Sequence, residues 1–282
     1  VGDNWRVLIG LGGIPILLLL WLRMVPESPR YLQQQGRIDE AREAIAWALE
    51  LPVSEVGDLP KQEGEVKSAG YSLIFKKYGK SLLIVAFGSF CFILGSSVIQ
   101  SWGQSILGSG FEFDSGMVGF LFMGVSLADL LGRLSSAWLA DRIGRRRVMF
   151  SYGMIGAVGL LISAGSVMLT TSAGWSTTGA GWVFFGGIVI AMAFGDGAFG
   201  VLNPFGAEQF PNEARATGLG LGYGIGSSAK VFGPALLGAM FGSKVELESI
   251  PVAFLLFAAL LAMGGVTYLF AKETKGESLD SI

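Results

Sequence analysis

Long apolar stretches, separated by short polar segments, are the dominant pattern along this chain of 282 residues. A helix needs about 20 predominantly apolar residues to cross a bilayer, and seven stretches are roughly that long or longer. They predict membrane-spanning helices, so the expected fold class is an all-α integral membrane protein. The predicted helices lie at roughly residues 6–25, 80–107, 116–140, 146–171, 181–208, 214–242 and 250–271.

Most of the 20 Lys and Arg residues lie in the polar segments, and every second segment between the predicted helices is cationic. The cationic segments are 26–79, 141–147, 209–215 and 272–282. With seven crossings all four fall on one side, which the positive-inside rule identifies as cytoplasmic. The alternative for the arginine-rich run at 141–147, a nuclear-localisation or nucleic-acid patch, requires soluble flanks, and the flanks here are apolar.

The segment at 26–79 is the only sizeable polar piece and suggests two helical bundles. Residues 37–51 show the periodicity of an amphipathic helix, and the Pro- and Gly-containing stretch after it is typical of a linker. We therefore expect four parts: residues 1–25, the last helix of an N-terminal bundle; 26–79, a cytoplasmic linker; 80–271, a six-helix C-terminal bundle; and 272–282, a cytoplasmic tail.

The amino-acid composition limits the kinds of functional site that the chain can form. Only 15% of residues are charged, against about 25% in soluble domains. The 43 glycines suit close helix packing in a membrane. With no histidine and a single cysteine, Cys91, the chain offers neither a metal-ligand cluster nor a nucleophile–base pair. We expect no enzymatic activity and no metal or organic cofactor. A GxGxxG match at 195–200 lies inside an apolar span, without the strand and soluble helix that a nucleotide site needs.

Four charged residues lie well inside predicted spans, where each costs about 2.5–3.5 kcal/mol on insertion scales. At a rise of about 1.5 Å per residue, Asp129 and Asp196 lie roughly 18 Å from the cytoplasmic ends of their helices and Lys230 roughly 22 Å. Asp129 and Arg133 are four residues apart and can pair within one helix. We expect these charges and neighbouring polar positions to converge on a wet central cavity. The candidate substrate or coupling residues are Asp129, Arg133, Asp196, Lys230, Ser97, Gln100, Gln104, Asn203, Tyr223 and Ser227.

The alternative is that these groups serve only as interhelical hydrogen bonds and buried ion pairs, with Asp196–Lys230 the obvious pair. Intramembrane ionisable residues more often mark a functional pathway. The pairs Asn203-Pro204 and Gly233-Pro234 also predict interruptions in two spans. Such breaks at membrane depth persist where protein or a water-filled cavity satisfies the freed backbone groups.

Four short motifs occur in order in the segments predicted to be cytoplasmic. They are Pro26-Glu27-Ser28-Pro29-Arg30, Asp141-Arg142-Ile143-Gly144-Arg145-Arg146, Glu208-Gln209-Phe210-Pro211 followed by Arg215, and Glu273-Thr274-Lys275-Gly276. Together they resemble the sugar-porter-like and metabolite:proton symporter branches of the major facilitator superfamily, from the sixth helix to the twelfth.

This resemblance implies a twelve-helix transporter of two six-helix bundles that works by alternating access. The chain would supply the last helix of the first bundle and all of the second, and the missing N-terminal bundle would be its partner. The resemblance also implies a cytoplasmic gate of charged residues that interlock when the site faces outward: Glu27, Arg30, Asp141, Arg142, Arg145, Arg146, Glu208, Arg215 and Glu273.

The chain departs from the family pattern at four places. One is the helix after Arg215, where metabolite symporters often have an arginine and this chain has Ser227 and Ser228, with Lys230 nearby as the positive charge. Residues 95–101 replace the Gln-Gln-Leu-Ser-Gly motif of many sugar porters, which argues against a hexose. Ala137 stands where the superfamily motif usually has glycine, and Lys272 replaces the proline often found before Glu-Thr-Lys-Gly.

We expect a multi-pass protein of the cell membrane, the inner membrane if the source is bacterial, that moves a small polar metabolite. An organic acid is favoured over a sugar, because Lys230 and Arg133 can pair with a carboxylate. Coupling to protons through Asp196 or Asp129 is expected, since burial disfavours a charged carboxylate. The expected partners are the lipid bilayer and the small-molecule substrate, with no nucleic acid. The alternatives are an uncoupled facilitator and a non-transporting half-transporter or scaffold.

Overall fold

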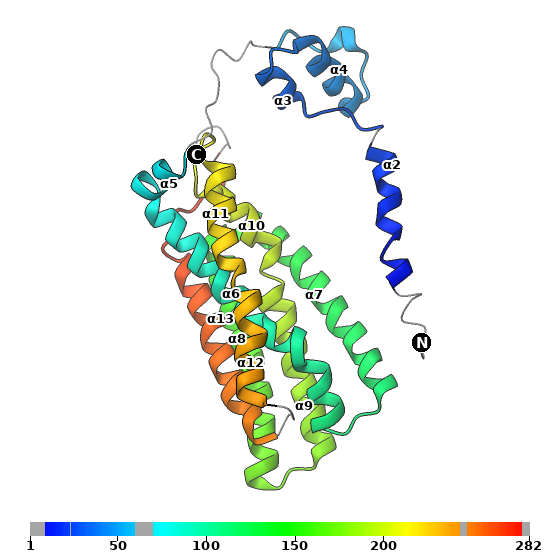
Figure 1. The fold of residues 1–282 in the computed structure, drawn as a ribbon, viewed down its shortest axis with the longest axis vertical. Coiled ribbons are helices and arrows are strands. Elements are labelled where there is room, and N and C mark those ends of the chain that lie inside the picture. Colours follow the sequence, from blue (N-terminus) through cyan, green and yellow to red (C-terminus); the bar gives the residue numbers. More distant parts are fainter. Residues whose placement is uncertain (1–8, 23, 60–69, 243–246, 278–282) are drawn as a thin grey trace. The chain divides into compact units, whose positions relative to one another are not determined.

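The computed structural model describes residues 9–22, 24–59, 70–242 and 247–277. It divides into two compact units, Val1–Lys67 and Ser68–Ile282 (Figure 1), which are considered separately. Throughout the described residues the ordered elements are helices, with no strand. The predicted all-α membrane fold is confirmed.

The first unit contains only short helices. The 3-10 helix η1 (Ile14–Leu17) and α2 (Leu18–Leu22) precede α3 (Pro29–Gln34), α4 (Ile38–Leu49) and the 3-10 helix η2 (Val53–Glu55). Helix α4 lies within the stretch expected to be amphipathic. It buries Ala41 and Ala44 against Leu32 of α3.

The helix predicted at 6–25 is not continuous over residues 9–22. A turn at Gly13, whose N–H donates to Gly10 O (3.0 Å), precedes the 3-10 segment η1. Pro15 lacks an N–H and its ring crowds the preceding turn, which explains why the α-helix is interrupted there. Residues 6–8 and 23 of that prediction lie outside the described residues.

The second unit is a helical bundle. Short α5 (Tyr71–Lys77) leads into α6 (Gly79–Ser105), which continues into the π-helix η3 (Ile106–Gly110). Then come α7 (Ser115–Ile143), α8 (Arg145–Ala173) and α9 (Thr177–Ile190), which runs through the π-helix η4 (Ala191–Asp196) towards α10 (Phe199–Glu208). The last elements are α11 (Arg215–Ser227), α12 (Ala229–Phe241), the 3-10 helix η5 (Leu247–Ser249) and α13 (Ile250–Tyr268).

Five of the described helices are long and apolar enough to cross a membrane. They are Gly79–Gly110, Ser115–Ile143, Arg145–Ala173, Thr177–Glu208 and Leu247–Tyr268. The span predicted at 214–242 is instead two helices of 13 residues, α11 and α12, which meet at Ser227 and Ser228. The sequence pattern therefore overestimated the continuity of this span.

Both proline pairs lie inside helices rather than at breaks, contrary to the sequence-based expectation. Pro204 lies inside α10 and Pro234 inside α12. In each case the regular α-helix is interrupted about five residues before the proline, just before Phe199 or Ala229. The displacement has a steric reason, because the proline ring meets the carbonyl of residue i−4 and disturbs the turn on its N-terminal side.

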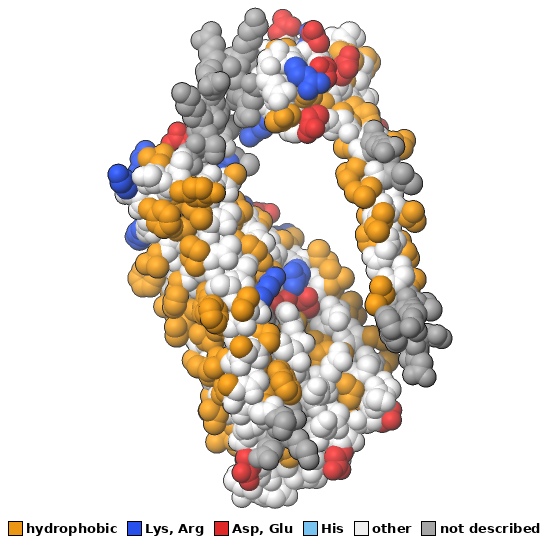
Figure 2. All heavy atoms as spheres, viewed as in Figure 1, with side chains coloured by type: hydrophobic (Ala, Val, Ile, Leu, Met, Phe, Trp, Pro, Cys, Tyr) orange, Lys and Arg blue, Asp and Glu red, His pale blue; other side chains and the backbone are white. Residues whose placement is uncertain are grey.

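Helices α6, α8 and α13 form the centre of the bundle, with α13 packed against both others (Figure 1). Helix α6 is the most enclosed of the five long helices and α7 the least. Apolar side chains of α7 such as Phe120, Met123 and Leu130 are more than half exposed. Figure 2 shows hydrophobic side chains over much of the surface of this unit. An apolar surface of this extent suits contact with lipid or with another apolar bundle.

Helix α7 approaches η4 backbone to backbone because small residues line the contact. A Cβ atom at Gly132 would collide with the carbonyl oxygen of Ala193 in η4. One at Gly200, at the start of α10, would collide with the carbonyl oxygen of Arg133. Ser136 Oγ adds a hydrogen bond to Gly197 O (2.7 Å) across the same contact. This approach sets how closely the side chains of α7 and η4 can meet.

Gly132→Ala is expected to destabilise the bundle by about 1–3 kcal/mol, the usual cost of overpacking. The matched control is Gly119→Ala on the same helix, where an added Cβ meets nothing within 4 Å. The control is expected to be neutral or slightly stabilising, since alanine favours helix. Thermal unfolding in detergent checks both. Equal midpoints for the two variants would contradict the close approach described here.

Candidate functional site

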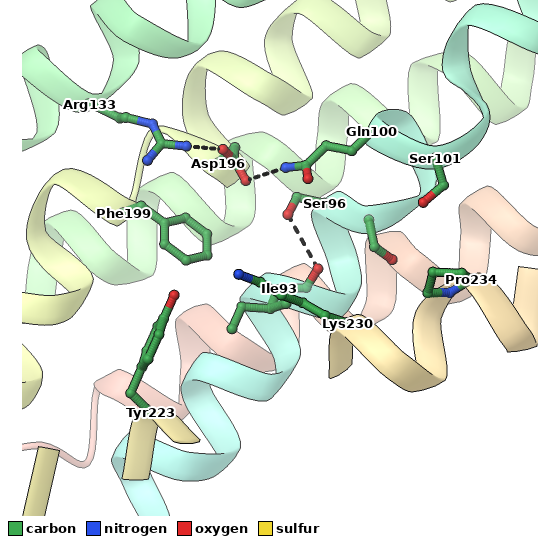
Figure 3. Close-up of a pocket in the computed structure, with 11 residues that line it drawn as sticks. Ile93, Ser96, Gln100, Ser101, Arg133, Asp196, Phe199, Tyr223, Lys230 and Pro234 are labelled. Atoms are coloured by element: carbon green, nitrogen blue, oxygen red, sulfur yellow. Dashed lines mark hydrogen bonds and ion pairs between the residues drawn. The ribbon is translucent and has the colours of Figure 1, made fainter. Parts of the chain in front are cut away.

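A cavity of about 450 Å³ opens midway along the second unit. This volume falls in the range of small-molecule sites, about 300–1,000 Å³. Helix α6 supplies more of the lining residues than any other element (Figure 3). The others come from α7, η4, α10, α11 and α12. The lining residues are Ile93, Ser96, Ser97, Gln100, Ser101, Arg133, Asp196, Phe199, Tyr223, Lys230 and Pro234.

The centre of the site is one guanidinium shared by two carboxylates. Arg133 Nε donates to Asp129 Oδ1 (2.9 Å), and Arg133 Nη2 pairs with Asp196 Oδ2. The Asp196 side chain is only 4% exposed. Its second oxygen, Oδ1, accepts a hydrogen bond from Gln100 Nε2 (3.0 Å). Asp196 is thus held from both α6 and α7.

Local helix geometry explains how these three charges meet. Asp129 and Arg133 lie one turn apart on α7, so their side chains share a face. Asp196 ends the π-helix η4, and π-helical turns occur frequently at functional sites. The glycine contact between α7 and η4 then brings the Asp196 carboxylate within reach of the guanidinium. Two carboxylates on one guanidinium leave the trio with one net negative charge when all are ionised.

Lys230 reaches the cavity from α12 (Figure 3). The alternative of an Asp196–Lys230 ion pair is wrong for this structure, because Asp196 pairs with Arg133. Among the described residues, none forms an ion pair or hydrogen bond with the Lys230 ammonium group. Phe199 and Tyr223 supply aromatic lining, and the Arg133 guanidinium lies over the Phe199 ring at 5.5 Å.

The structure gathers six of the ten candidate residues around the cavity: Arg133, Asp196, Lys230, Ser97, Gln100 and Tyr223. Asp129 joins them through Arg133 without lining the cavity. The other three, Gln104, Asn203 and Ser227, lie elsewhere, and Gln104 is exposed. The roles of the gathered residues stay predictions.

Five lining residues are absent from the candidate list: Ile93, Ser96, Ser101, Phe199 and Pro234. Ile93 and Ser96 lie one turn before Ser97 and Gln100 on α6, and that spacing was the available signal. Phe199 comes three residues after Asp196, but aromatic residues are so frequent in apolar spans that its position alone indicates only packing.

A second cluster of charges lies at the end of the bundle predicted to be cytoplasmic, and we call it the Glu273 network: Asp141, Arg145, Arg146, Glu208 and Glu273. Arg145 pairs with Asp141 (3.1 Å) and with Glu208 (3.5 Å). The Glu273 carboxylate accepts hydrogen bonds from the backbone N–H groups of Arg145 (3.0 Å) and Arg146 (3.1 Å).

The Glu273 contact depends on Gly144. This glycine links α7 to α8 with a φ of +100°, a conformation that L side chains rarely adopt. A Cβ there would lie 2.7 Å from Glu273 Oε2. The carboxylate therefore occupies the first turn of α8, where free N–H groups and the helix dipole favour a negative charge.

Four of the nine gate candidates fall outside the Glu273 network. Arg142 stacks on the Trp138 ring at 3.8 Å, and its carbonyl accepts a hydrogen bond from Lys275 Nζ. Arg215 donates to Asn212 Oδ1 (2.8 Å). Glu27 and Arg30 belong to the first unit, which is described by itself.

Comparisons with known proteins match this chain to transporters over nearly its whole length. A family model described as sugar (and other) transporter matches residues 1–282. The niacin transporter NiaP of Acinetobacter baylyi is 29% identical over 293 residues, which cover 99% of this chain and 61% of NiaP. The probable metabolite transport protein CsbC of Bacillus subtilis is 26% identical over 291 residues, which cover 99% of this chain and 60% of CsbC.

A solved structure of similar fold is the major facilitator superfamily proton:xylose symporter XylE bound to 6-bromo-6-deoxy-D-glucose. It matches with a TM-score of 0.70 at 18% identity, covering 99% of this chain and 58% of XylE. The chain thus spans about 60% of the length of the curated relatives it matches.

Glu273→Gln is expected to speed amide hydrogen exchange in residues 144–150 by tenfold or more. A hydrogen bond to a charged group contributes about 1.5–3 kcal/mol, and Glu273 accepts two such bonds from backbone amides of α8. Glu277→Gln is the matched control on the same tail, because Glu277 pairs only with Lys272 among the described residues. Exchange that is unchanged in Glu273→Gln would show that this carboxylate does not hold the start of α8.

Proposed function

The chain belongs to the sugar (and other) transporter family of the major facilitator superfamily, and from this premise we propose that it forms part of a secondary transporter for a small polar metabolite. The transporter works by alternating access, and the 80–271 bundle moves against a second bundle of similar size. The fraction of its relatives that the chain spans, about 60%, supports this division.

The observation that carries the proposal is the charged cavity midway along an apolar bundle. Desolvated charges are costly in a membrane, and they mark substrate and ion pathways. The cavity concentrates Arg133, Asp196 and Lys230, together with serine and glutamine side chains that can bind a polar solute. Its contributing helices include α12, which follows the break at Ser228 and so lies beside a point where the chain can bend.

The Asp129–Asp196 pair is the proposed proton site. Arg133 balances one of the two carboxylates, and a proton shared by the pair balances the other. Coupled groups of this kind take up a proton as a pair. The groups that face Asp196 are Asp129 and Arg133 from α7, Ser96 and Gln100 from α6, and Lys230 and Tyr223 across the cavity. Helices α9 and α13 contain no Asp, Glu, Lys or Arg, and α8 has only its three initial arginines.

The Glu273 network supports the gating part of the proposal. It joins the ends of α7, α8 and α10 to the tail after α13. Single exposed ion pairs contribute under about 1 kcal/mol, whereas this network adds backbone hydrogen bonds at a helix start. It would close the bundle end when the cavity faces outward and separate when the cavity opens to the other side.

Uncoupled facilitated diffusion is the second candidate, and one observation favours it. Arg133 contacts both Asp129 and Asp196 directly, and an ion-pair trio of this kind can serve packing alone. The two candidates differ in their response to a pH gradient.

Uptake by the natural full-length protein in liposomes tests the proposal, with a panel of sugars, polyols and carboxylic acids. An inward gradient of one pH unit is expected to support about tenfold accumulation per coupled proton, because 1.4 kcal/mol corresponds to a factor of ten. Asp196→Asn is expected to abolish accumulation while retaining exchange of substrate between the two sides. Asp39→Asn, at an exposed position of α4, is the matched control and should behave as wild type.

The outcomes separate the candidates. Uptake that does not depend on the pH gradient would exclude proton coupling and favour the uncoupled facilitator. Gradient-driven accumulation that survives Asp196→Asn would place the proton elsewhere. No protein-dependent uptake for any member of the panel would overturn the transport function.

A further inference from the structure

The cavity contains two cations in different electrostatic situations. The Arg133 charge is offset by two carboxylates, because Nε pairs with Asp129 and Nη2 pairs with Asp196. Lys230 lines the same cavity and, within the described part of the chain, has no carboxylate within ion-pair distance. The positive charge available to a solute is therefore that of Lys230.

The packing of α12 on α6 holds Lys230 at this position. Gly233, three residues further along α12, lies so close to α6 that a Cβ there would be 2.8 Å from Ser97 Oγ. This contact keeps the first turn of α12, which carries Lys230, next to the serine-lined part of α6. The ammonium thus shares the cavity with the Ser101 hydroxyl, which can also donate to an anion. The Ser97 hydroxyl, also in the cavity lining, donates to Leu94 O (2.7 Å).

The remaining lining limits the kind of anion. Ile93, Phe199, Tyr223 and Pro234 present apolar and aromatic surface. Figure 3 shows the Phe199 and Tyr223 rings on the side of the cavity away from Ser101 and Pro234. A dianion would need a second unpaired cation, because a buried charge without a partner is costly. The described lining supplies one, so the charges favour a single negative group attached to an apolar body.

We propose that the cavity binds a monocarboxylate, with its carboxylate on Lys230 and its apolar body between Phe199 and Tyr223, and that one proton on the Asp129–Asp196 pair accompanies it. This inference rests on the proposed transport function and specifies its substrate class. The charges of the two sites balance separately. Without ligands the trio carries one negative charge and Lys230 one positive charge. The carboxylate neutralises Lys230, the proton neutralises the trio, and the loaded cavity has the same net charge as the empty one.

Two consequences follow for the transport cycle. The loaded and empty forms cross between the two sides of the membrane with equal charge, so the cycle moves one proton and one carboxylate without net charge. The membrane potential, which acts on each charge moved, therefore contributes nothing to the driving force, and the pH difference supplies it.

Binding of matched acid and amide probes tests the substrate class. Benzoate and benzamide have the same shape and differ in charge, and glucose represents neutral sugars. With purified full-length protein, benzoate is expected to bind at least about tenfold more tightly than benzamide, since hydrogen bonds to charged groups are the stronger ones. Lys230→Gln is expected to abolish that preference, and Lys230→Arg to retain it and so show that the fold survives. Lys80→Gln, at the start of α6, is the control and should keep the wild-type preference.

Equal binding of benzoate and benzamide, a preference for glucose over both, or a benzoate preference that survives Lys230→Gln would each overturn the inference. None of these results bears on gradient-driven uptake itself. Pronounced accumulation of a neutral sugar would leave the transport function intact while excluding the monocarboxylate. If the protein took up no member of the panel, that result would contradict the proposed transport function instead.

Current measurements on proteoliposomes test the charge balance. Addition of benzoate is expected to raise the external pH beyond the change seen with protein-free vesicles, because one proton enters with each carboxylate, and to produce no sustained transport current. Lys230→Gln should lose the protein-dependent pH change. A sustained current carried by benzoate would contradict the one-to-one balance.

Discussion

The Arg133 guanidinium, shared between Asp129 and Asp196 inside an apolar bundle, is the interaction on which the rest of the site depends. Moving charges out of water is costly, and the cost is recovered only where geometry and additional hydrogen bonds are good. The chain meets this condition through the one-turn spacing of Asp129 and Arg133, the π-helical end of η4 and the Gln100 hydrogen bond. Because two carboxylates share one guanidinium, the three side chains carry one net negative charge when all are ionised.

The same helices carry both charged clusters. Helix α7 bears Arg133 near its middle and Asp141 near its end, while the span from α9 to α10 bears Asp196 and Glu208. The glycine contact packs α7 closely against η4 at the depth of Gly132. A shift of either helix would therefore change the geometry of both the cavity and the Glu273 network, which is the physical basis of the proposed coupling between a solute site and a gate.

Hydropathy was sufficient to predict the long spans, since the length of an apolar run is fixed by bilayer thickness. It failed where backbone geometry intervenes. The 214–242 stretch is apolar throughout, yet it breaks at Ser227 and Ser228. Counting residues from the cytoplasmic ends of the helices places Asp129, Asp196 and Lys230 at similar depths in the membrane. It does not give the direction in which each side chain points from its helix axis. Hence the sequence left an Asp196–Lys230 pair open as an alternative, whereas in the structure the Asp196 carboxylate pairs with Arg133.

Infrared spectroscopy of the carboxylic C=O stretch tests the central claim most directly, because a protonated carboxyl absorbs apart from an ionised one. In the purified full-length protein, lowering the pH should produce a protonated-carboxyl band that disappears in both Asp129→Asn and Asp196→Asn and persists in Asp39→Asn. A band that survives both central substitutions, or no band before the protein unfolds in acid, would contradict a single proton shared by the carboxylates around Arg133.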